Sequence, residues 1–139
     1  MNDVESEVRV RYADTDKMGY AYHANFLVWL EVGRTEWLRA RGLCYVDVEA
    51  GGCILPVVSV TVRYLRPARY DDVLRIRTRL AEGRKASLSF AYEVRRGEEI
   101  LAQGSTQHAC AGPDGRVIRM PQALRDVIAE ALAPGEGAA

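Results

Sequence analysis

The distribution of apolar residues predicts one long helix near the start of the chain. Between Phe26 and Ala40 the apolar positions recur at steps of three and four, which is the period of one helical face. The first two turns are apolar on nearly every side, so we expect a core helix whose N-terminal end is buried. Arginines and glutamates then take over the outer face, and Gly42 is suited to a left-handed stop.

Five segments are predicted to be strands with one apolar face, and all but the last alternate between apolar and polar residues. They span residues 5–12, 56–65, 72–80, 85–96 and 100–111. The last four follow one another through short turns, which predicts an antiparallel meander. The small residues of the last segment suit it to lie beneath a tightly packed helix.

The remaining segments complete a single domain over residues 1–132. Residues 43–52 predict an irregular connection with one short helical turn, and residues 121–132 a short amphipathic helix. Residues 133–139 have nothing to bury, so we expect a disordered tail. One apolar helix and five one-faced strands leave one sensible packing, an α+β architecture in which an antiparallel sheet curls around the helix.

Composition and charge exclude several classes of function. The 139 residues carry 19 basic and 19 acidic side chains, so the formal net charge is zero and gives no electrostatic footprint for nucleic acid. No apolar run approaches the length of a membrane span, and the N-terminus lacks a basic and apolar leader. We therefore expect a cytoplasmic protein without membrane insertion.

The cysteines and histidines indicate neither a disulfide nor a metal site. Cys44, Cys53 and Cys110 are odd in number and lack C-x-x-C spacing, so we expect free thiols that pack as small buried hydrophobes. His108 shares a strand face with Cys110, but this spacing is too wide for a dependable hydrogen bond, so a cysteine nucleophile is only weakly supported. His23 and His108 have no ligand spacing, and we expect no metal.

A polar loop with two acids and a histidine leads into the long helix. It reads Asp-Thr-Asp-x-x-Gly-x-x-Tyr-His-x-Asn from Asp14 to Asn25. Asp and Thr side chains readily bond to their own backbone, so the tripeptide taken alone indicates turn chemistry. Residues 22–25, however, lie where a helix start offers unpaired amides and the positive end of its dipole to an oxygen that gains negative charge.

This succession of elements resembles the hotdog fold of the 4-hydroxybenzoyl-CoA thioesterase family. Within the family it is most similar to the bacterial acyl-CoA thioesterases associated with the Tol-Pal system. The likeness extends from Val8 to about Leu132. It implies a five-stranded antiparallel sheet wrapped around one long central helix. The residues that carry it are 11–16, Gly19, 22–25, Glu31, Arg34, 64–68 and 71–72.

The resemblance implies hydrolysis of an acyl-CoA thioester, with coenzyme A present only as part of the substrate. Asp16 corresponds to the family's catalytic acid, which acts as nucleophile or general base. The His23 main-chain amide corresponds to the group that polarises the carbonyl. Tyr22 and Asn25 are substrate-binding candidates, although Asn25 is as well suited to be a helix N-cap. For Asp14 the turn interpretation stands.

The resemblance also implies a homodimer with a continuous sheet, which can double to a homotetramer. Uncovered edge strands support an oligomer independently, since edges are usually paired or shielded. Glu31 and Arg34 have the spacing of an ion pair within a helix. Candidate cations for the coenzyme A phosphates are Arg66, Arg84, Lys85 and Arg116.

Two other functions remain open. A hotdog hydratase or dehydratase would pair a histidine with an acid elsewhere, and the Asp-Thr-Asp loop favours hydrolysis over that reaction. A non-catalytic acyl-CoA binding protein would sense its ligand, but the sequence shows no additional DNA-binding or partner domain for this role.

Overall fold

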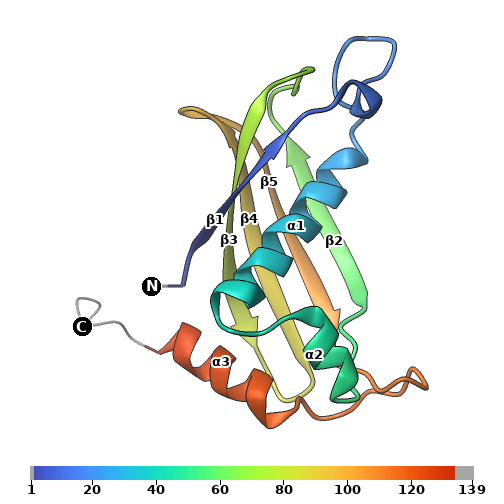
Figure 1. Cartoon of the computed structure of the whole chain (residues 1–139), viewed down its shortest axis with the longest axis vertical. Coiled ribbons are helices and arrows are strands. Elements are labelled where there is room, and N and C mark those ends of the chain that lie inside the picture. Colours follow the sequence, from blue (N-terminus) through green and yellow to red (C-terminus); the bar gives the residue numbers. More distant parts are fainter. Residues whose placement is uncertain (1, 134–139) are drawn as a thin grey trace.

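One antiparallel sheet of five strands carries a long helix along one face (Figure 1). The computed structural model describes residues 2–133, so the predicted tail lies outside the described residues from position 134 onward. The predicted α+β architecture, a five-stranded antiparallel sheet with one central helix, is confirmed. The strands are β1 (Val4–Arg9), β2 (Val57–Tyr64), β3 (Val73–Gly83), β4 (Ser87–Arg96) and β5 (Glu99–Ala109), and the helices are α1 (Asn25–Ala40), α2 (Tyr45–Ala50) and α3 (Gln122–Leu132).

The order of strands across the sheet is β1-β3-β4-β5-β2. Strands β3, β4 and β5 form an antiparallel meander, as predicted. The prediction is wrong for β2, which pairs with β5 instead of β3, while β1 takes the place beside β3. Alternation of apolar residues specifies which face of a strand is buried but not which strand lies next to it. The connection from β2 to β3 therefore crosses the end of the sheet.

Two glycines allow α1 and the sheet to approach closely. A Cβ atom on Gly33 would lie 2.4 Å from Thr78 Oγ1 on β3. A Cβ atom on Gly104 would lie 2.9 Å from the Thr61 carbonyl and 3.3 Å from a Leu30 methyl group of α1. Of the small residues of β5, which are predicted to lie beneath a tightly packed helix, Gly104 lies against a side chain of α1, whereas most of the helix packs over β1 and β3.

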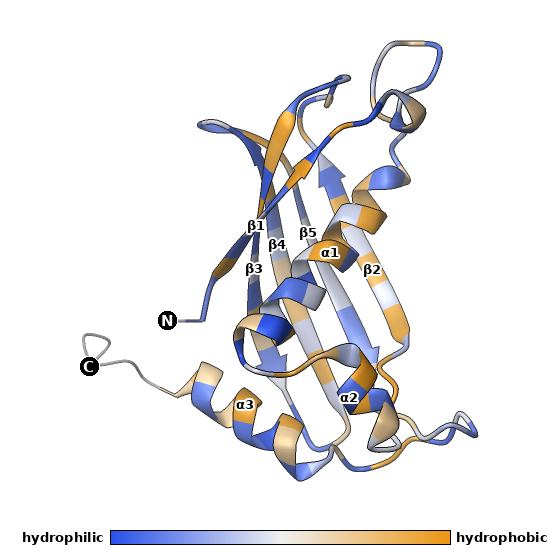
Figure 2. Ribbon diagram, viewed as in Figure 1, coloured by the Kyte–Doolittle hydropathy of each residue, from blue (hydrophilic) through white to orange (hydrophobic). Residues whose placement is uncertain are grey.

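The first turns of α1 are not buried on every side, contrary to the prediction. Leu27 is 40% exposed and Val28 is 53% exposed. The reason is that α1 packs against β1, β3 and β4 and has no second layer above it. Strand β2 is uncovered as well, although Figure 2 shows hydrophobic residues along most of its length. A hydrophobic helix side and a hydrophobic edge strand thus remain open within one chain.

The ends of the elements follow local capping. The Gly42 backbone has a φ of 84° and ends α1 as predicted, and α2 is the expected short helical turn. Strand β1 stops at Arg9, before its predicted end, because residues 12–14 form a 3₁₀ turn. None of the helices in the described part of the chain is long and apolar enough to cross a membrane.

In the part of the chain that the structure describes, Glu31 and Arg34 do not form the predicted ion pair. Arg34 turns inward to the hydroxyl groups of Tyr45 and Tyr92 instead. Glu31 stays exposed, because its position on α1 points away from the sheet. A spacing of three residues allows an ion pair on a helix, but two tyrosine hydroxyls in the core provide better partners for a half-buried guanidinium.

Two of the three cysteines are buried, and Cys44 is exposed, contrary to the prediction. Cys53 and Cys110 are fully buried as free thiols with their sulfur atoms 2.8 Å apart. Burial raises the pKa of the Cys110 thiol to about 12, so it stays protonated. Both ring nitrogens of His108 are already hydrogen-bonded, Nδ1 to the Leu55 carbonyl and Nε2 to the Thr106 hydroxyl. This agrees with the weak support for a cysteine nucleophile.

Candidate active site

The acidic loop folds against the N-terminal end of α1, at one end of the sheet (Figure 1). The Asp16 amide donates to the Tyr20 carbonyl at 2.9 Å, and its carboxylate Oδ1 accepts the Met18 amide at 2.9 Å. Asp16 is partly exposed, and among the described residues its Oδ2 accepts no hydrogen bond. One carboxylate oxygen is therefore fixed by the loop, and the other is available to a substrate or a water molecule.

Asp16 borders a hollow of about 300 Å³ that reaches the start of α1. Its apolar wall is formed by Phe26 of the helix and by Tyr64 and Leu65 at the end of β2. His23 lines the same hollow, so the structure brings Asp16 and His23 together as the sequence predicts. A hollow with mostly apolar walls, one carboxylate and a helix start is suited to an acyl group.

The helix start presents amides without a backbone partner. The N-cap of α1 is Ala24, and no side chain caps it. In the described part of the chain neither the His23 amide nor the Ala24 amide donates to a backbone carbonyl. Such amides at the positive end of a helix dipole stabilise an oxygen that gains negative charge.

Tyr64 is the site residue that the sequence did not single out. Its hydroxyl donates to the His23 carbonyl at 2.9 Å, and its ring meets the Phe26 ring edge-on with centroids 5.1 Å apart. Burial raises the pKa of the Tyr64 phenol, which therefore remains a donor at neutral pH. This bond holds the peptide group that carries the Ala24 amide. The sequence held one sign of this role, because Tyr64 belongs to residues 64–68, which carry the resemblance to the family.

Asp14 has a structural role, as the turn interpretation predicts. Asp14 is 5% exposed, and its carboxylate accepts hydrogen bonds from the Arg11 main-chain amide at 2.9 Å and from the Arg11 guanidinium at 2.8 Å. The hydrogen bond from Arg11 lowers the pKa of Asp14, despite its burial. Asp14 thus caps the short turn before the loop and is not available for attack.

Asn25 does not cap the helix. It is the first residue of α1, and its side-chain Nδ2 donates to the Asp14 carbonyl at 2.8 Å. The Tyr22 amide donates to the same carbonyl at 2.8 Å, so both residues tie the loop to the helix. The N-cap interpretation is therefore wrong, while the Tyr22 ring remains half exposed beside His23.

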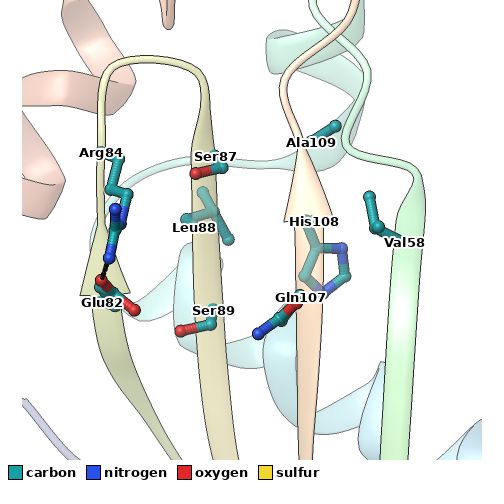
Figure 3. Close-up of a pocket in the computed structure, with 9 residues that line it drawn as sticks. All are labelled: Val58, Glu82, Arg84, Ser87, Leu88, Ser89, Gln107, His108 and Ala109. Atoms are coloured by element: carbon teal, nitrogen blue, oxygen red, sulfur yellow. Dashed lines mark hydrogen bonds and ion pairs between the residues drawn. The ribbon is translucent and has the colours of Figure 1, made fainter.

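The candidate phosphate-binding cations lie at both ends of the sheet. Arg66 lines the hollow that contains Asp16 and is paired with Glu99 at 3.5 Å. Arg84 lies at the opposite end, where it is paired with Glu82 in a hollow of about 320 Å³ (Figure 3). Within one chain, Arg84 is therefore remote from Asp16.

The sequence matches the family model of the thioesterase-like superfamily over residues 10–132. It is 35% identical over 126 residues to the acyl-CoA thioester hydrolase YbgC of Escherichia coli O6:H1, and the alignment covers 88% of this chain and 91% of that protein. The DHNA-CoA thioesterase from Staphylococcus aureus superposes with a TM-score of 0.87 at 32% identity, over 94% of this chain and 89% of that one. The hypothetical protein TT1821 from Thermus thermophilus superposes with a TM-score of 0.88 at 38% identity, over 91% and 98% of the two chains.

Proposed function

This chain belongs to the thioesterase-like superfamily and is a thioester hydrolase, and we propose that Asp16 and the amides at the start of α1 carry out the hydrolysis of an acyl-CoA. Membership confirms the resemblance to the hotdog thioesterases. The observation that carries the proposed site is that Asp16 and His23, whose amide has no backbone partner among the described residues, line one hollow at the start of α1. The products are a free acid and coenzyme A.

The geometry supports two routes that share the same oxyanion site. As a general base, Asp16 takes a proton from the water molecule that attacks the carbonyl carbon. As a nucleophile, its carboxylate attacks directly, expels the thiolate and forms an anhydride that water then hydrolyses. In both routes the amides of His23 and Ala24 hold the oxygen that becomes negative, the C–S bond breaks, and the thiolate gains a proton.

A single turnover in ¹⁸O-water separates the two routes. A general base places the label directly in the product acid, because the attacking oxygen comes from water. A nucleophilic Asp16 gives a first product acid without label when water attacks the Asp16 side of the anhydride, because the oxygen that enters the product comes from the carboxylate. Mass spectrometry of the acid released in the first turnover distinguishes the outcomes, and Asp16 is essential in either case.

Tyr22 and Asn25 are proposed to contact the substrate. The Tyr22 ring is half exposed beside the His23 ring, with centroids 4.6 Å apart, and can pack against an acyl or pantetheine group. In Asn25 the Nδ2 atom is committed to the Asp14 carbonyl, so only Oδ1 is proposed to face a substrate. Loss of a Tyr22 contact should raise KM more than it lowers kcat.

We further propose that the enzyme is a homodimer joined along the free edge of β2. This edge strand is exposed along its length, and Val57, Val58 and Val60 are 47%, 66% and 42% exposed. Hydrophobic edge strands pair with another strand or aggregate. In an antiparallel pair of β2 strands, the end of the partner's sheet that is opposite its own Asp16 would lie toward the hollow beside Asp16. That end carries the partner's Arg84 and the partner's Lys85.

A panel of acyl-CoAs assayed by release of free thiol tests the proposed function. The panel should include short aliphatic, long aliphatic and aromatic acyl groups. Turnover of at least one class, abolished by Asp16→Asn, supports hydrolysis at this site. Tight binding of an acyl-CoA with no thiol release from any class would favour the non-catalytic binding protein, and release of water-addition products would favour a hydratase.

A further inference from the structure

The connection between β2 and β3, residues 65–72, forms one wall of the candidate site. We call this segment the crossover, because it joins strands that are not neighbours in the sheet. Its Arg66 and Pro67 line the hollow shared by Asp16 and His23. A connecting segment of this kind has few ladder hydrogen bonds of its own, so neighbouring parts of the fold must hold it in place.

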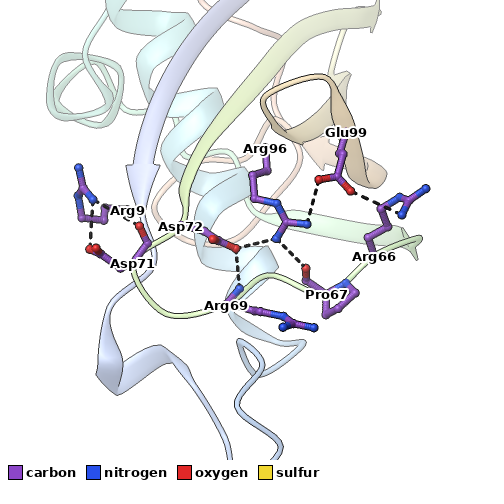
Figure 4. A network of polar contacts seen from close by, with 8 residues as sticks. All are labelled: Arg9, Arg66, Pro67, Arg69, Asp71, Asp72, Arg96 and Glu99. Carbon is purple, nitrogen blue, oxygen red and sulfur yellow. Dashed lines mark hydrogen bonds and ion pairs between the residues drawn. The ribbon is translucent and has the colours of Figure 1, made fainter.

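Arg96, the last residue of β4, holds the crossover at two points (Figure 4). One terminal nitrogen donates to Asp72 Oδ2 at 2.7 Å and to the Pro67 carbonyl at 3.3 Å, and the other donates to Glu99 at 3.3 Å. The Arg96 side chain is only 29% exposed. The hydrogen bond that the guanidinium donates to Asp72 raises the pKa of Arg96. A planar guanidinium reaches three acceptors at once, which a lysine ammonium does not reproduce.

The crossover is in turn paired with the acidic loop. The Ala21 amide donates to the Ala68 carbonyl at 2.7 Å, and Tyr20 and Arg69 form an antiparallel bridge. The Arg69 guanidinium lies 5.2 Å from the centre of the Tyr20 ring. The Arg69 amide donates to the Asp72 carboxylate at 2.8 Å, the same group that Arg96 binds.

From this pairing the path continues directly to the catalytic candidate. The Tyr20 carbonyl accepts the Asp16 amide at 2.9 Å, and Thr15 bridges to Ala21. Hydrogen bonds, joined by short stretches of backbone, therefore connect the Arg96 guanidinium through the crossover and the loop to Asp16.

We propose that Arg96 is a positioning residue for Asp16, which it holds at the correct distance from the start of α1 by locking the crossover against the end of β4. This inference rests on the proposed role of Asp16. A displacement of about 1 Å between reacting groups can cost on the order of a hundredfold in rate. An arginine that never touches the substrate can therefore set the rate through the segment it holds.

Arg95 and Ile128 provide matched controls. Arg95 is the neighbouring arginine on β4, its side chain is also 29% exposed, and it is paired with Glu93 instead of the crossover. Ile128 of α3 packs beside Gly83 at the other end of β3 and is buried. Arg95→Met thus tests the loss of an arginine from the same strand, and Ile128→Ala tests a loss of stability at the other end of the sheet of the same chain.

The kinetic test compares kcat and KM for one acyl-CoA across these variants. We expect Arg96→Met to lower kcat by about 10- to 100-fold while KM changes by less than about threefold, since the reacting groups are misplaced but the substrate still binds. Arg96→Lys should restore part of kcat, because it keeps the charge beside Asp72. Arg95→Met and Ile128→Ala should keep kcat. A wild-type kcat in Arg96→Met, or a change no larger than in Ile128→Ala, overturns the proposal.

Hydrogen exchange gives a readout that does not depend on activity. In Arg96→Met the Ala21 amide should exchange at least about tenfold faster than in Arg95→Met, because its acceptor on the crossover is released. Unchanged exchange over residues 14–22 overturns the proposal. If the wild-type protein hydrolyses no acyl-CoA while this exchange increases, the proposed function fails and the positioning contact stands. If Arg96→Met does not fold, Asp72→Asn removes the charge that Arg96 binds and is judged by the same two outcomes.

Discussion

At the scale of single residues, the two acids of the loop have opposite surroundings. Asp14 is nearly buried and accepts an amide and a guanidinium from Arg11. Asp16 is partly exposed and accepts one amide, from Met18, which leaves an oxygen available in a hollow at a helix start. The first arrangement stabilises a turn, and the second is suited to chemistry. Two aspartates separated by one residue are thus distinguished by their hydrogen-bond partners.

Asp14 should make the stability of the protein depend on pH. Its pKa is lowered in the folded state by the hydrogen bond from Arg11, so its stabilising contribution is present above the unfolded pKa of about 3.9 and is lost as the pH falls toward the folded value. We expect Asp14→Asn to lower the melting temperature by about 3–5 °C at pH 7 and by less at pH 3. A difference between the two proteins that stays constant over this range would contradict the contribution of the charge.

The Tyr64 hydroxyl should matter for rate more than for stability. Tyr64→Phe keeps the ring against Phe26 but removes the donor to the His23 carbonyl, which costs about 1 kcal/mol for a partly exposed hydrogen bond. We expect kcat to fall by about three- to tenfold, because the peptide group that carries the Ala24 amide loses a fixed orientation. Tyr12→Phe, which removes the hydroxyl of a tyrosine that is 79% exposed, is the control. Equal kinetics in both variants would count against this role.

At the scale of elements, periodicity predicted α1 and all five strands because each keeps one face toward a common core. It could not predict that β2 lies beside β5, since burial on one face is compatible with either neighbour. It also missed the role of Asn25, whose side chain binds a carbonyl that is distant in sequence. Local patterns therefore specify elements and their faces, whereas long-range hydrogen bonds decide their neighbours and the details of the site.

Close packing of α1 on β3 should make Gly33 sensitive to a single methyl group. Gly33→Ala adds a Cβ 2.4 Å from Thr78 Oγ1, so we expect a loss of about 1–3 kcal/mol in the free energy of unfolding, although alanine favours a helix. Thr78→Ala removes the nearest atom, and the double variant should lose less than the sum of the two single variants. Denaturant unfolding measures all three. Additive losses would show that the contact with Thr78 does not limit how closely α1 approaches β3.

At the scale of the whole molecule, the open hydrophobic surfaces are the feature that a single chain does not account for. The sequence pattern implied a helix start buried on all sides, and the structure leaves Leu27 and Val28 exposed there. The hydrophobic edge strand β2 is uncovered too. A second copy paired along β2 would cover part of this surface, which reconciles the pattern in the sequence with the packing of one chain.

A charge on the inner face of β2 should separate the proposed dimer. Val60 is 42% exposed, and Val60→Glu would bury a carboxylate in the paired strands, which is costly without a partner charge. We expect the wild-type protein to show at least twice the chain mass of 15.5 kDa in light scattering, and Val60→Glu to approach the mass of one chain. Val46→Glu, on an exposed position of α2, should keep the wild-type mass. A wild-type monomer at micromolar concentration would contradict the dimer.

The most direct test of the central claim is the turnover number of Asp16→Asn with a reactive acyl-CoA. Asparagine keeps the shape and the hydrogen-bonding oxygen but removes the charge that attacks or activates water, so kcat should fall by at least about 10²-fold, as on loss of a general base. Asp14→Asn, measured at neutral pH where it remains folded, should lose far less. Near-normal thiol release by an Asp16→Asn protein with the wild-type circular dichroism spectrum would contradict the assignment of Asp16.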